Sequence, residues 1–259
     1  MCDNTIIGYG ASGKVELKRK FDILVAEKRM VTDGSSDTTR ASAISESMLL
    51  MNLHHPNIVR VYAFHVFPCE VVLEMEYGGT ELFRLVETLP DPLSVFRQVC
   101  EAVAYLHDMC IAHRDIKLEN AVVDEKTWHV RLIDFGFARH FVHSHTSTER
   151  IGSVAYCSPD LWTRAYDVFC TDVWALGVLL FALAHRHYFP FQKACDDDAH
   201  FQRFAQAQAS EGKTPSEALC AAHPNLTFVE WSRLGLDKTL ALSPCARAPT
   251  ARALLLDVA

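Results

Sequence analysis

Two short polar motifs, the second of which begins fourteen positions after the last residue of the first, constrain this chain more than any other feature of its sequence. The first, HRDIKLEN, runs from His113 to Asn120, and the second, DFG, occupies Asp134 to Gly136. The apolar run VRLI leads directly into the second motif and predicts a strand there. Either motif alone arises by chance as a polar turn, but both together at this spacing are specific. They predict two segments at strand ends that bring an ordered set of charged side chains to one place.

A glycine-rich segment lies near the N-terminus, where GYGASGKV at Gly8 to Val15 fits the pattern G-x-G-x-x-G-x-V. Dinucleotide-binding folds use a similar fingerprint, but in those folds a helix follows the glycines at once. Here KVELKRKF alternates apolar and polar residues and then leads into LVAEK, which predicts two strands. The segment is therefore expected to be a flap in which Gly8, Gly10 and Gly13 allow close backbone approach to phosphates.

In combination these motifs resemble the eukaryotic-type protein kinase family, and the resemblance covers residues 6–256. It is closest to the calmodulin-dependent and AMP-activated groups of serine/threonine kinases. The resemblance implies an α+β, bilobal protein-kinase-like fold. Residues 1–77 would form a small, mainly β N-lobe with one helix, helix C, and residues 78–259 would form the hinge and a larger, mainly α C-lobe.

The resemblance assigns roles in phosphoryl transfer from ATP. Asp115 would accept the proton of the attacking hydroxyl group, and Lys117 would neutralise charge on the transferred phosphoryl group. Asn120 and Asp134 would each bring an oxygen to Mg²⁺, which takes few protein ligands and bridges the nucleotide phosphates.

A lysine and a glutamate would complete the catalytic set. Lys28 ends VAEK and matches the strand lysine that pairs with the α- and β-phosphates. Glu46 lies ten residues before Pro56 on a predicted helix, where the resemblance places the carboxylate that holds this lysine. The alternative is that both are solvated surface charges.

The resemblance also implies a pocket for adenine. VVLEMEYGGTELF at residues 71–83 predicts a strand that runs into a glycine-containing connection. Met75 would lie at the back of the pocket, the backbone of Glu76 to Gly78 would bond the adenine edge, and Glu81 would contact the ribose or a basic substrate residue. Three further side chains would contact the two faces of the adenine ring, or would only pack in the hydrophobic core: Val15, Ala26 and Val122.

The C-terminal half points to a protein as substrate. GSVAYCSPD at residues 152–160 resembles the peptide-positioning segment of protein kinases, and DVWALGVLLFALA at residues 172–184 resembles the buried helix F. Asp172 would accept N–H groups of the catalytic loop, the segment His113 to Asn120, or would only cap that helix. Lys117, two residues after Asp115, indicates serine/threonine specificity. Glu119 and Glu81 would favour arginine two or three residues before the phosphorylated residue.

Composition limits the partners and the compartment. The 259 residues are 49% hydrophobic and carry a net charge of −7 without a basic run, which disfavours nucleic acid and favours a basic peptide. The longest apolar run, within residues 173–184, is too short to span a bilayer. Nine scattered cysteines without a C-x-x-C pair predict reduced thiols, and so a cytoplasmic or nuclear protein. A monomer is expected.

Other segments of the C-terminal half are expected to be scaffold. Asp91 followed by Pro92 predicts the start of a helix, and the acidic run Asp196 to Asp198 is interpreted as solvated charge.

Three positions depart from the family pattern. Glu27 stands where an aliphatic residue is usual, which is expected to alter N-lobe packing or the electrostatics of the lysine. Asp160 replaces a glutamate, and its expected partner Arg247 is one place out of register, so a looser ion pair is expected.

The activation loop carries an acid where related kinases carry a phosphate. Glu149 lies three residues before Gly152 and would take part of the role of that phosphate against Arg114. Thr146, Ser147 and Thr148 are candidate phosphorylation sites, and a solvated Glu149 is the alternative.

Two functions remain open on the sequence. The first is an active serine/threonine kinase that uses ATP and Mg²⁺. The second is a pseudokinase, a nucleotide-binding scaffold that keeps the fold without turnover.

Overall fold

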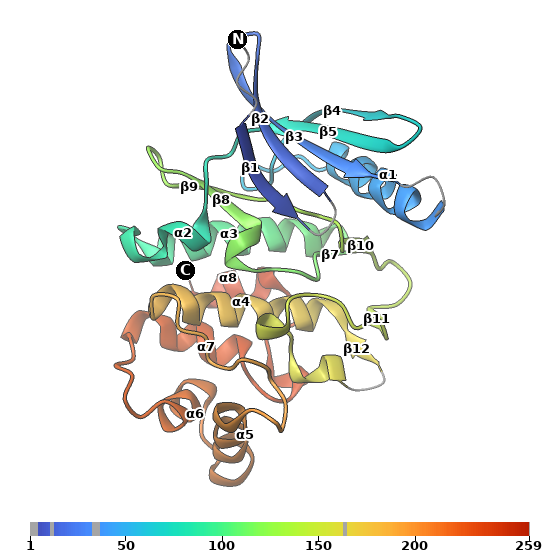
Figure 1. The fold of residues 1–259 in the computed structure, drawn as a ribbon. Coiled ribbons are helices and arrows are strands. Elements are labelled where there is room, and N and C mark those ends of the chain that lie inside the picture. Colours follow the sequence, from blue (N-terminus) through green and yellow to red (C-terminus); the bar gives the residue numbers. More distant parts are fainter. Residues whose placement is uncertain (1–4, 11–12, 33–36, 163–164, 259) are drawn as a thin grey trace.

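The N-terminal part of the chain is a five-stranded antiparallel sheet with one helix (Figure 1). The computed structural model describes residues 5–10, 13–32, 37–162 and 165–258. The sheet has the order β1-β2-β3-β5-β4, and α1 (Asp37–Met51) contacts β4 and β5. Its strands are β1 (Thr5–Gly10), β2 (Gly13–Lys20), β3 (Ile23–Val31), β4 (Val61–Val66) and β5 (Glu70–Glu76). The strands expected around the glycine-rich segment are therefore confirmed.

Side-chain alternation along β3 separates the two faces of this sheet. Ala26 and Lys28 point to the side that faces the rest of the protein, and Glu27 points to the opposite side. Glu27 is nevertheless buried, because Lys18 contacts it and Arg29 Nη2 lies 2.8 Å from its carboxylate. The unusual residue of the VAEK strand thus organises an ion-pair network on the outer face, and the Lys28 side chain is on the other face.

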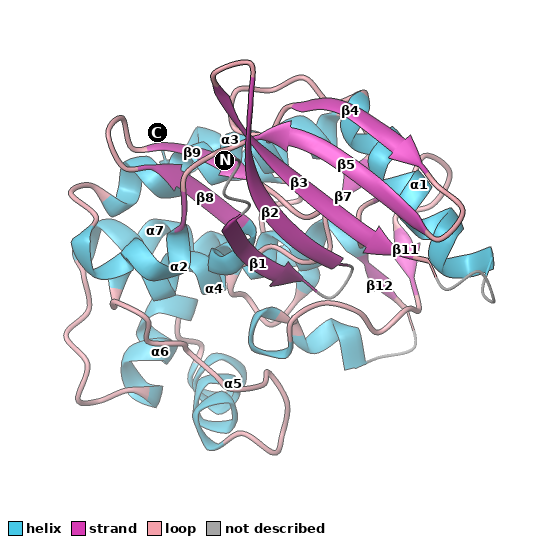
Figure 2. Ribbon diagram, turned by 45° about the horizontal axis from the view of Figure 1, so that its top comes forward, coloured by secondary structure: helices cyan, strands magenta, loops and turns pink. Residues whose placement is uncertain are grey.

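The C-terminal part is mainly helical, as Figure 2 shows by colour. Pro92 opens α3, and the Asp91 carboxylate caps it by accepting from the Ser94 N–H at 3.0 Å, as the sequence predicts. The long helices α3 and α4 contact each other, α8 contacts α3, and α7 contacts α4. The helices are α2 (Leu82–Leu85), α3 (Pro92–Asp108), α4 (Val168–Ala184), α5 (Ala199–Glu211), α6 (Pro215–Ala222), α7 (Arg233–Thr239) and α8 (Ala251–Val258).

Short strands hold the loops that carry the two motifs. Residues 113–120 lie between β7 (Ile111–Ala112) and β8 (Ala121–Asp124), and DFG follows β9 (His129–Leu132). β6 (Thr80–Glu81), β8 and β9 form one sheet, β7 pairs with β10 (Arg139–His140), and β11 (Thr146–Ser147) pairs with β12 (Tyr166–Asp167). Since β8 and β9 are antiparallel neighbours, the loop before β8 and the loop after β9 emerge at the same edge.

One hydrophobic cluster joins the two parts of the chain. It contains buried residues of β3, β5, α3, α4 and α8, among them Met30, Leu73, Phe96 and the fully buried Trp174. Among the described helices, none is both long and apolar enough to cross a membrane. The α+β architecture is confirmed, whereas the boundary between residues 77 and 78 stays a prediction.

In the helical part, the alternative role of Asp172 as a cap and the interpretation of Asp198 as solvated charge are both wrong. Helix α4 begins at Val168 with Asp167 as its cap, so Asp172 lies inside the helix and is not a helix cap. Asp198 is not merely solvated: it caps α5 and accepts from the N–H groups of His200 and Phe201. Both errors have the same cause. The position of a helix N-cap depends on where the chain turns into the helix, and the periodicity of apolar residues does not mark that turn.

Candidate active site

A cavity of about 1040 Å³ lies between the N-terminal sheet and the loops of the helical part. It collects residues that are far apart in the sequence, from the glycine-rich strand to the activation loop. The predicted site residues that line it are Gly8, Val15, Ala26, Lys28, Glu46, Met75, Glu76, Gly78, Glu81, Asp115, Lys117, Asn120, Val122 and Asp134.

One of the predicted glycines, Gly13, has a structural reason outside the cavity. Gly13 is not among the lining residues, and a β-carbon on it would come within 2.2 Å of the Arg29 carbonyl oxygen. Gly10 ends β1 and pairs with Gly13 across the hairpin. The glycine at position 13 is therefore explained by the close approach of β2 to β3.

A buried lysine joins three elements at the back of the cavity. Lys28 Nζ lies 2.7 Å from Glu46 Oε1 on α1 and 2.9 Å from Asp134 Oδ1 after β9. Burial alone would lower the pKa of Lys28, but the two carboxylates outweigh this effect and raise it. Burial likewise acts to raise the pKa of Asp134, but Lys28 and the Gly136 N–H hold it below its usual value. The lysine is therefore a cation and Asp134 a carboxylate at neutral pH.

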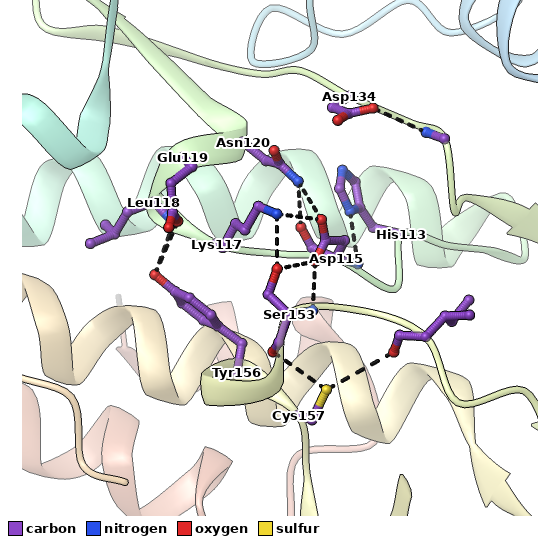
Figure 3. A network of polar contacts seen from close by, with 12 residues as sticks. His113, Asp115, Lys117, Leu118, Glu119, Asn120, Asp134, Ser153, Tyr156 and Cys157 are labelled. Carbon is purple, nitrogen blue, oxygen red and sulfur yellow. Dashed lines mark hydrogen bonds and ion pairs between the residues drawn. The ribbon is translucent and has the colours of Figure 1, made fainter. Parts of the chain in front are cut away.

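The catalytic-loop aspartate is held from three sides (Figure 3). Asn120 Nδ2 donates to the Asp115 carboxylate at 2.9 Å, and Lys117 Nζ lies 2.7 Å from the same oxygen. Ser153 donates to the other oxygen through both its backbone N–H and its hydroxyl group, each at 2.9 Å. Lys117 also donates to Ser153 Oγ at 2.8 Å. These contacts fix the carboxylate and leave it facing the cavity.

Ser153 is a site residue that sequence reasoning did not single out. It follows Gly152 in the segment GSVAYCSPD, which was interpreted only as peptide-positioning. Gly152 before it has φ of 103°, a backbone conformation that the sequence alone does not reveal, so no local signal marked Ser153.

Helix α4 holds the catalytic loop in place through Asp172. The Asp172 carboxylate accepts from the backbone N–H groups of His113 and Arg114, both at 2.8 Å, and lies 3.1 Å from His107 Nε2. The predicted contact between Asp172 and the catalytic loop is therefore confirmed. Arg114 has φ of 67°, a left-handed conformation that is rare outside glycine, and these contacts hold it there.

The phenylalanine of DFG is packed away from the cavity. Phe135 is fully buried, and its ring lies 4.9 Å from the His113 ring. Burial lowers the pKa of His113, so the imidazole is neutral at pH 7. With Phe135 inside the core, the preceding Asp134 faces Lys28 and the cavity.

Two glycines shape the connection between the two parts. A β-carbon on Gly78 would come within 2.5 Å of Val122 Cγ2. Gly79 has φ of 111°, and a β-carbon there would lie 2.0 Å from the Val123 carbonyl oxygen. The Glu76 N–H donates to the Arg60 carbonyl at 2.9 Å, so this group is not available to a ligand.

The activation loop contacts the catalytic loop through an arginine. Arg114 Nη1 contacts the Glu149 carboxylate, and Arg114 Nε donates to the Phe137 carbonyl at 2.7 Å. The predicted proximity of Glu149 to Arg114 is confirmed. The ion pair between Asp160 and Arg247 also forms in spite of its shifted register, with Arg247 buried and its Nε donating to the Ala241 carbonyl at 2.7 Å.

Comparison with known proteins agrees with this geometry. The sequence profile of the protein kinase domain matches residues 2–254. The chain belongs to the protein kinase family. It is 34% identical over 204 residues to the SNF-related serine/threonine-protein kinase of Rattus norvegicus, which covers 74% of the chain and 27% of that protein.

Two further kinases show similar identity. The serine/threonine-protein kinase oca2 of Schizosaccharomyces pombe is 32% identical over 83% of the chain and 35% of its own length. The calcium-dependent protein kinase 4 of Plasmodium berghei is 32% identical over 69% of the chain and 36% of its own length. The chain thus spans about a third or less of the length of these relatives.

A protein kinase domain uses ATP and a divalent metal ion, and the oxygen donors of the cavity fit such an ion. Among the described residues no cluster of three or more His, Cys, Asp or Glu could hold a metal by itself. Asn120 and Asp134 both line the cavity, and hard divalent ions that bind phosphates need only one or two protein carboxylates or amides. The Asn120 Nδ2 group is used by Asp115, which leaves the amide oxygen for the ion.

Proposed function

We propose that this chain is an ATP-dependent serine/threonine protein kinase that transfers the γ-phosphate to a Ser or Thr hydroxyl group of a protein. Residues 1–77 would serve as the N-lobe and residues 78–259 as hinge and C-lobe of one kinase domain. One observation carries the proposal: Lys28 bonds Glu46 and Asp134 in the same cavity in which Lys117 and Asn120 orient Asp115.

Each polar group then has a role in the transfer. Asp115 accepts the proton of the substrate hydroxyl group, and Lys117, which lies between Asp115 and Ser153, stabilises negative charge on the transferred group. Lys28 orients the α- and β-phosphates, and Glu46 keeps its ammonium group in place. Asn120 and Asp134 would hold Mg²⁺, which would neutralise phosphate charge when bound.

The nucleotide base would lie against the connection between the lobes. Met75 would form the back wall of the adenine pocket. Backbone groups of Glu76 to Gly78, other than the Glu76 N–H, would bond the adenine edge. The glycine-rich hairpin with Gly8, Gly10 and Gly13 would cover the phosphates. Three apolar residues on the cavity wall would contact the ring: Val15, Ala26 and Val122.

The substrate would be a protein with basic residues before the phosphorylated one. Glu81 and Glu119 both line the cavity, and the net charge of −7 disfavours nucleic acid. We further propose that the chain is a monomer. A location in the cytoplasm or nucleus is supported by the free state of all eight cysteines that the described residues contain.

The pseudokinase alternative is disfavoured by the site. A scaffold without turnover has no need for a charged Lys28 and Asp134 held together with Glu46, or for an aspartate oriented by three residues. All five groups that transfer requires face one cavity.

The test is phosphate transfer by the purified chain to a mixture of basic proteins, with γ-labelled ATP and Mg²⁺. Asp115→Asn should lower transfer by at least about 10²-fold while nucleotide binding is retained, because only the base is lost. Asp134→Asn should weaken Mg²⁺–ATP binding as well. Full transfer by Asp115→Asn would show that the catalytic loop is wrongly assigned, and nucleotide binding by the wild type without any transfer would establish the pseudokinase.

A further inference from the structure

Arg84 is a cation that lines the cavity beside one of its acids, Glu81. Glu81 ends β6, and Arg84 lies one turn later on α2. Arg84 Nε is 3.1 Å from Glu81 Oε2, and both residues line the cavity together with Glu119. Leu82 between them is fully buried, so α2 is anchored and both charged side chains are held on the open side.

Glu119 also lines the cavity, and its surroundings differ from those of Glu81. Its carboxylate accepts from the Tyr156 hydroxyl at 3.5 Å, and burial raises the pKa of Tyr156, so that partner stays neutral. Within the described part of the chain, no Lys, Arg or His nitrogen forms an ion pair with Glu119. The negative charge of Glu119 is therefore uncompensated, whereas that of Glu81 is matched by a guanidinium group.

We propose that Arg84 is a specificity-determining residue that covers Glu81 against basic side chains of the substrate and leaves Glu119 as the open acid. This proposal rests on the proposed kinase function. A substrate arginine that approaches Glu81 must displace Arg84 and is also repelled by it. The side chain of Arg84 is 67% exposed and that of Glu81 34%, so the pair is weak enough to be displaced but still discriminates.

The expected effect concerns selectivity between peptides. Two peptides would be used, identical except for arginine or alanine three residues before the phosphorylated serine. The measured quantity is the ratio of their kcat/KM values. Arg84→Gln should raise the preference for the arginine peptide by about three- to tenfold, the size of one exposed ion pair with one like-charge repulsion. In the wild type, Glu119→Gln should lower the preference more than Glu81→Gln does.

A double-mutant comparison distinguishes the covering of Glu81 by Arg84 from the general loss of one positive charge. In the Glu81→Gln background, Arg84→Gln should give a smaller gain, because there is no carboxylate left to uncover. Arg252→Gln is the matched control, since Arg252 forms a similarly exposed ion pair with Asp108 at 2.7 Å and does not line the cavity. It should leave the ratio unchanged.

Several outcomes would overturn the inference. These are an equal gain with Arg252→Gln, an equal gain in the Glu81→Gln background, no change with Arg84→Gln, or a wild-type preference for acidic residues at this position. If both peptides are phosphorylated but no variant changes the ratio of their kcat/KM values, the role of Arg84 is refuted and the proposed kinase function stands. If the wild type phosphorylates neither peptide nor any protein, the proposed function fails and this inference fails with it.

Discussion

Gly8 and Gly13 belong to the same glycine-rich hairpin, but the space around their α-carbons differs. A β-carbon on Gly8 would have no heavy atom within 4 Å, whereas one on Gly13 would lie 2.2 Å from the Arg29 carbonyl oxygen. We expect Gly13→Ala to force β2 away from β3 and to lower the free energy of unfolding by about 1–3 kcal/mol. Gly8→Ala should change it by less than about 0.5 kcal/mol. Chemical denaturation of both variants measures the difference, and equal losses would contradict it.

Glu46 and Glu27 allow a matched test of the buried lysine contact. Both are buried glutamates that bind cations, but Glu46 contacts Lys28 in the cavity, whereas Glu27 lies on the outer face of the sheet. Glu46→Gln should lower kcat/KM for ATP by about 10- to 100-fold, because Lys28 is no longer held in position. Glu27→Gln should affect stability with little effect on kcat/KM. The test is to measure kcat/KM for ATP with both folded variants. A similar loss of kcat/KM in both would show that only the burial of a charge matters.

At the level of single residues, sequence motifs predicted the groups that stand close together along the chain. Asp115, Lys117 and Asn120 were found because their spacing within one loop is fixed by the chemistry. Ser153 and Arg84 were not found. Lys117 and Ser153 are 36 residues apart, and Arg84 has a role only because α2 places it beside Glu81 at the cavity mouth. Such roles depend on tertiary contacts, which no local pattern encodes.

The cap residue of α5, Asp198, allows a test of how much one helix start contributes to stability. Asp198 accepts from the N–H groups of His200 and Phe201 at 2.9 Å each and also from Gln192 N–H at 2.8 Å. Asp198→Asn keeps one oxygen for the cap but places an NH2 group against the Gln192 N–H, which loses its acceptor. The free energy of unfolding should therefore fall by about 1 kcal/mol, which corresponds to a fall in Tm of about 2–4 °C. The neighbouring exposed Asp196 provides the control, and Asp196→Asn should be neutral. Equal shifts for the two variants would show that the acidic run acts only through its charge.

The pH dependence of this cap has a definite sign. Burial acts to raise the pKa of Asp198, but the backbone N–H groups that donate to it outweigh burial and lower it. A lowered pKa contributes stability above the unfolded-state pKa, about 3.9, and this contribution is lost as the pH falls through the folded-state value. The difference in Tm between wild type and Asp198→Asn should therefore be full near pH 7 and shrink below about pH 4. A difference that grows in acid would contradict the assignment.

Elements were predicted best where their periodicity is strong. The strands β2 and β3 and the helix α3 appear where alternation, helical spacing and an Asp-Pro start place them. The start of α4 was missed by four residues, because the segment that resembles helix F begins at Asp172, whereas the residue that caps the helix is Asp167. The cap role of Asp198 depends on the preceding loop folding back to offer the Gln192 N–H, which is a tertiary event.

At the scale of the whole molecule, Arg114 connects the segments that must be aligned for transfer. Its backbone N–H donates to Asp172 in α4, its Nε donates to the carbonyl of Phe137 after DFG, and its Nη1 contacts Glu149 in the activation loop. The Glu149 carbonyl in turn accepts from the Tyr166 hydroxyl at the start of β12. One buried guanidinium group therefore fixes the activation loop relative to the catalytic loop.

The contact between Arg114 and Glu149 leads to a prediction about basal activity. The Arg114 side chain is 4% exposed and that of Glu149 63%, so the guanidinium group is sheltered while its carboxylate partner is partly screened by water. A carboxylate has one negative charge, against about 1.5 to 2 for a phosphate, and should order the loop incompletely. We expect protein treated with phosphatase to keep measurable kinase activity. Phosphorylation at Thr146, Ser147 or Thr148 should raise that activity further.

Replacement of the acid is the direct test of this contact. Glu149→Ala, treated with phosphatase, should lose activity by about two- to tenfold relative to equally treated wild type, the range for one partly exposed ion pair to a buried arginine. Glu230→Ala is the control, because Glu230 pairs with Arg233 at 3.0 Å on the surface and does not touch the catalytic loop. Raising the ionic strength should narrow the gap between wild type and Glu149→Ala, since screening weakens the contact that only the wild type has. If dephosphorylated wild type is already inactive, or if Glu149→Ala matches it at every salt concentration, the carboxylate does not stand in for a phosphate and Arg114 is held by its carbonyl contact alone.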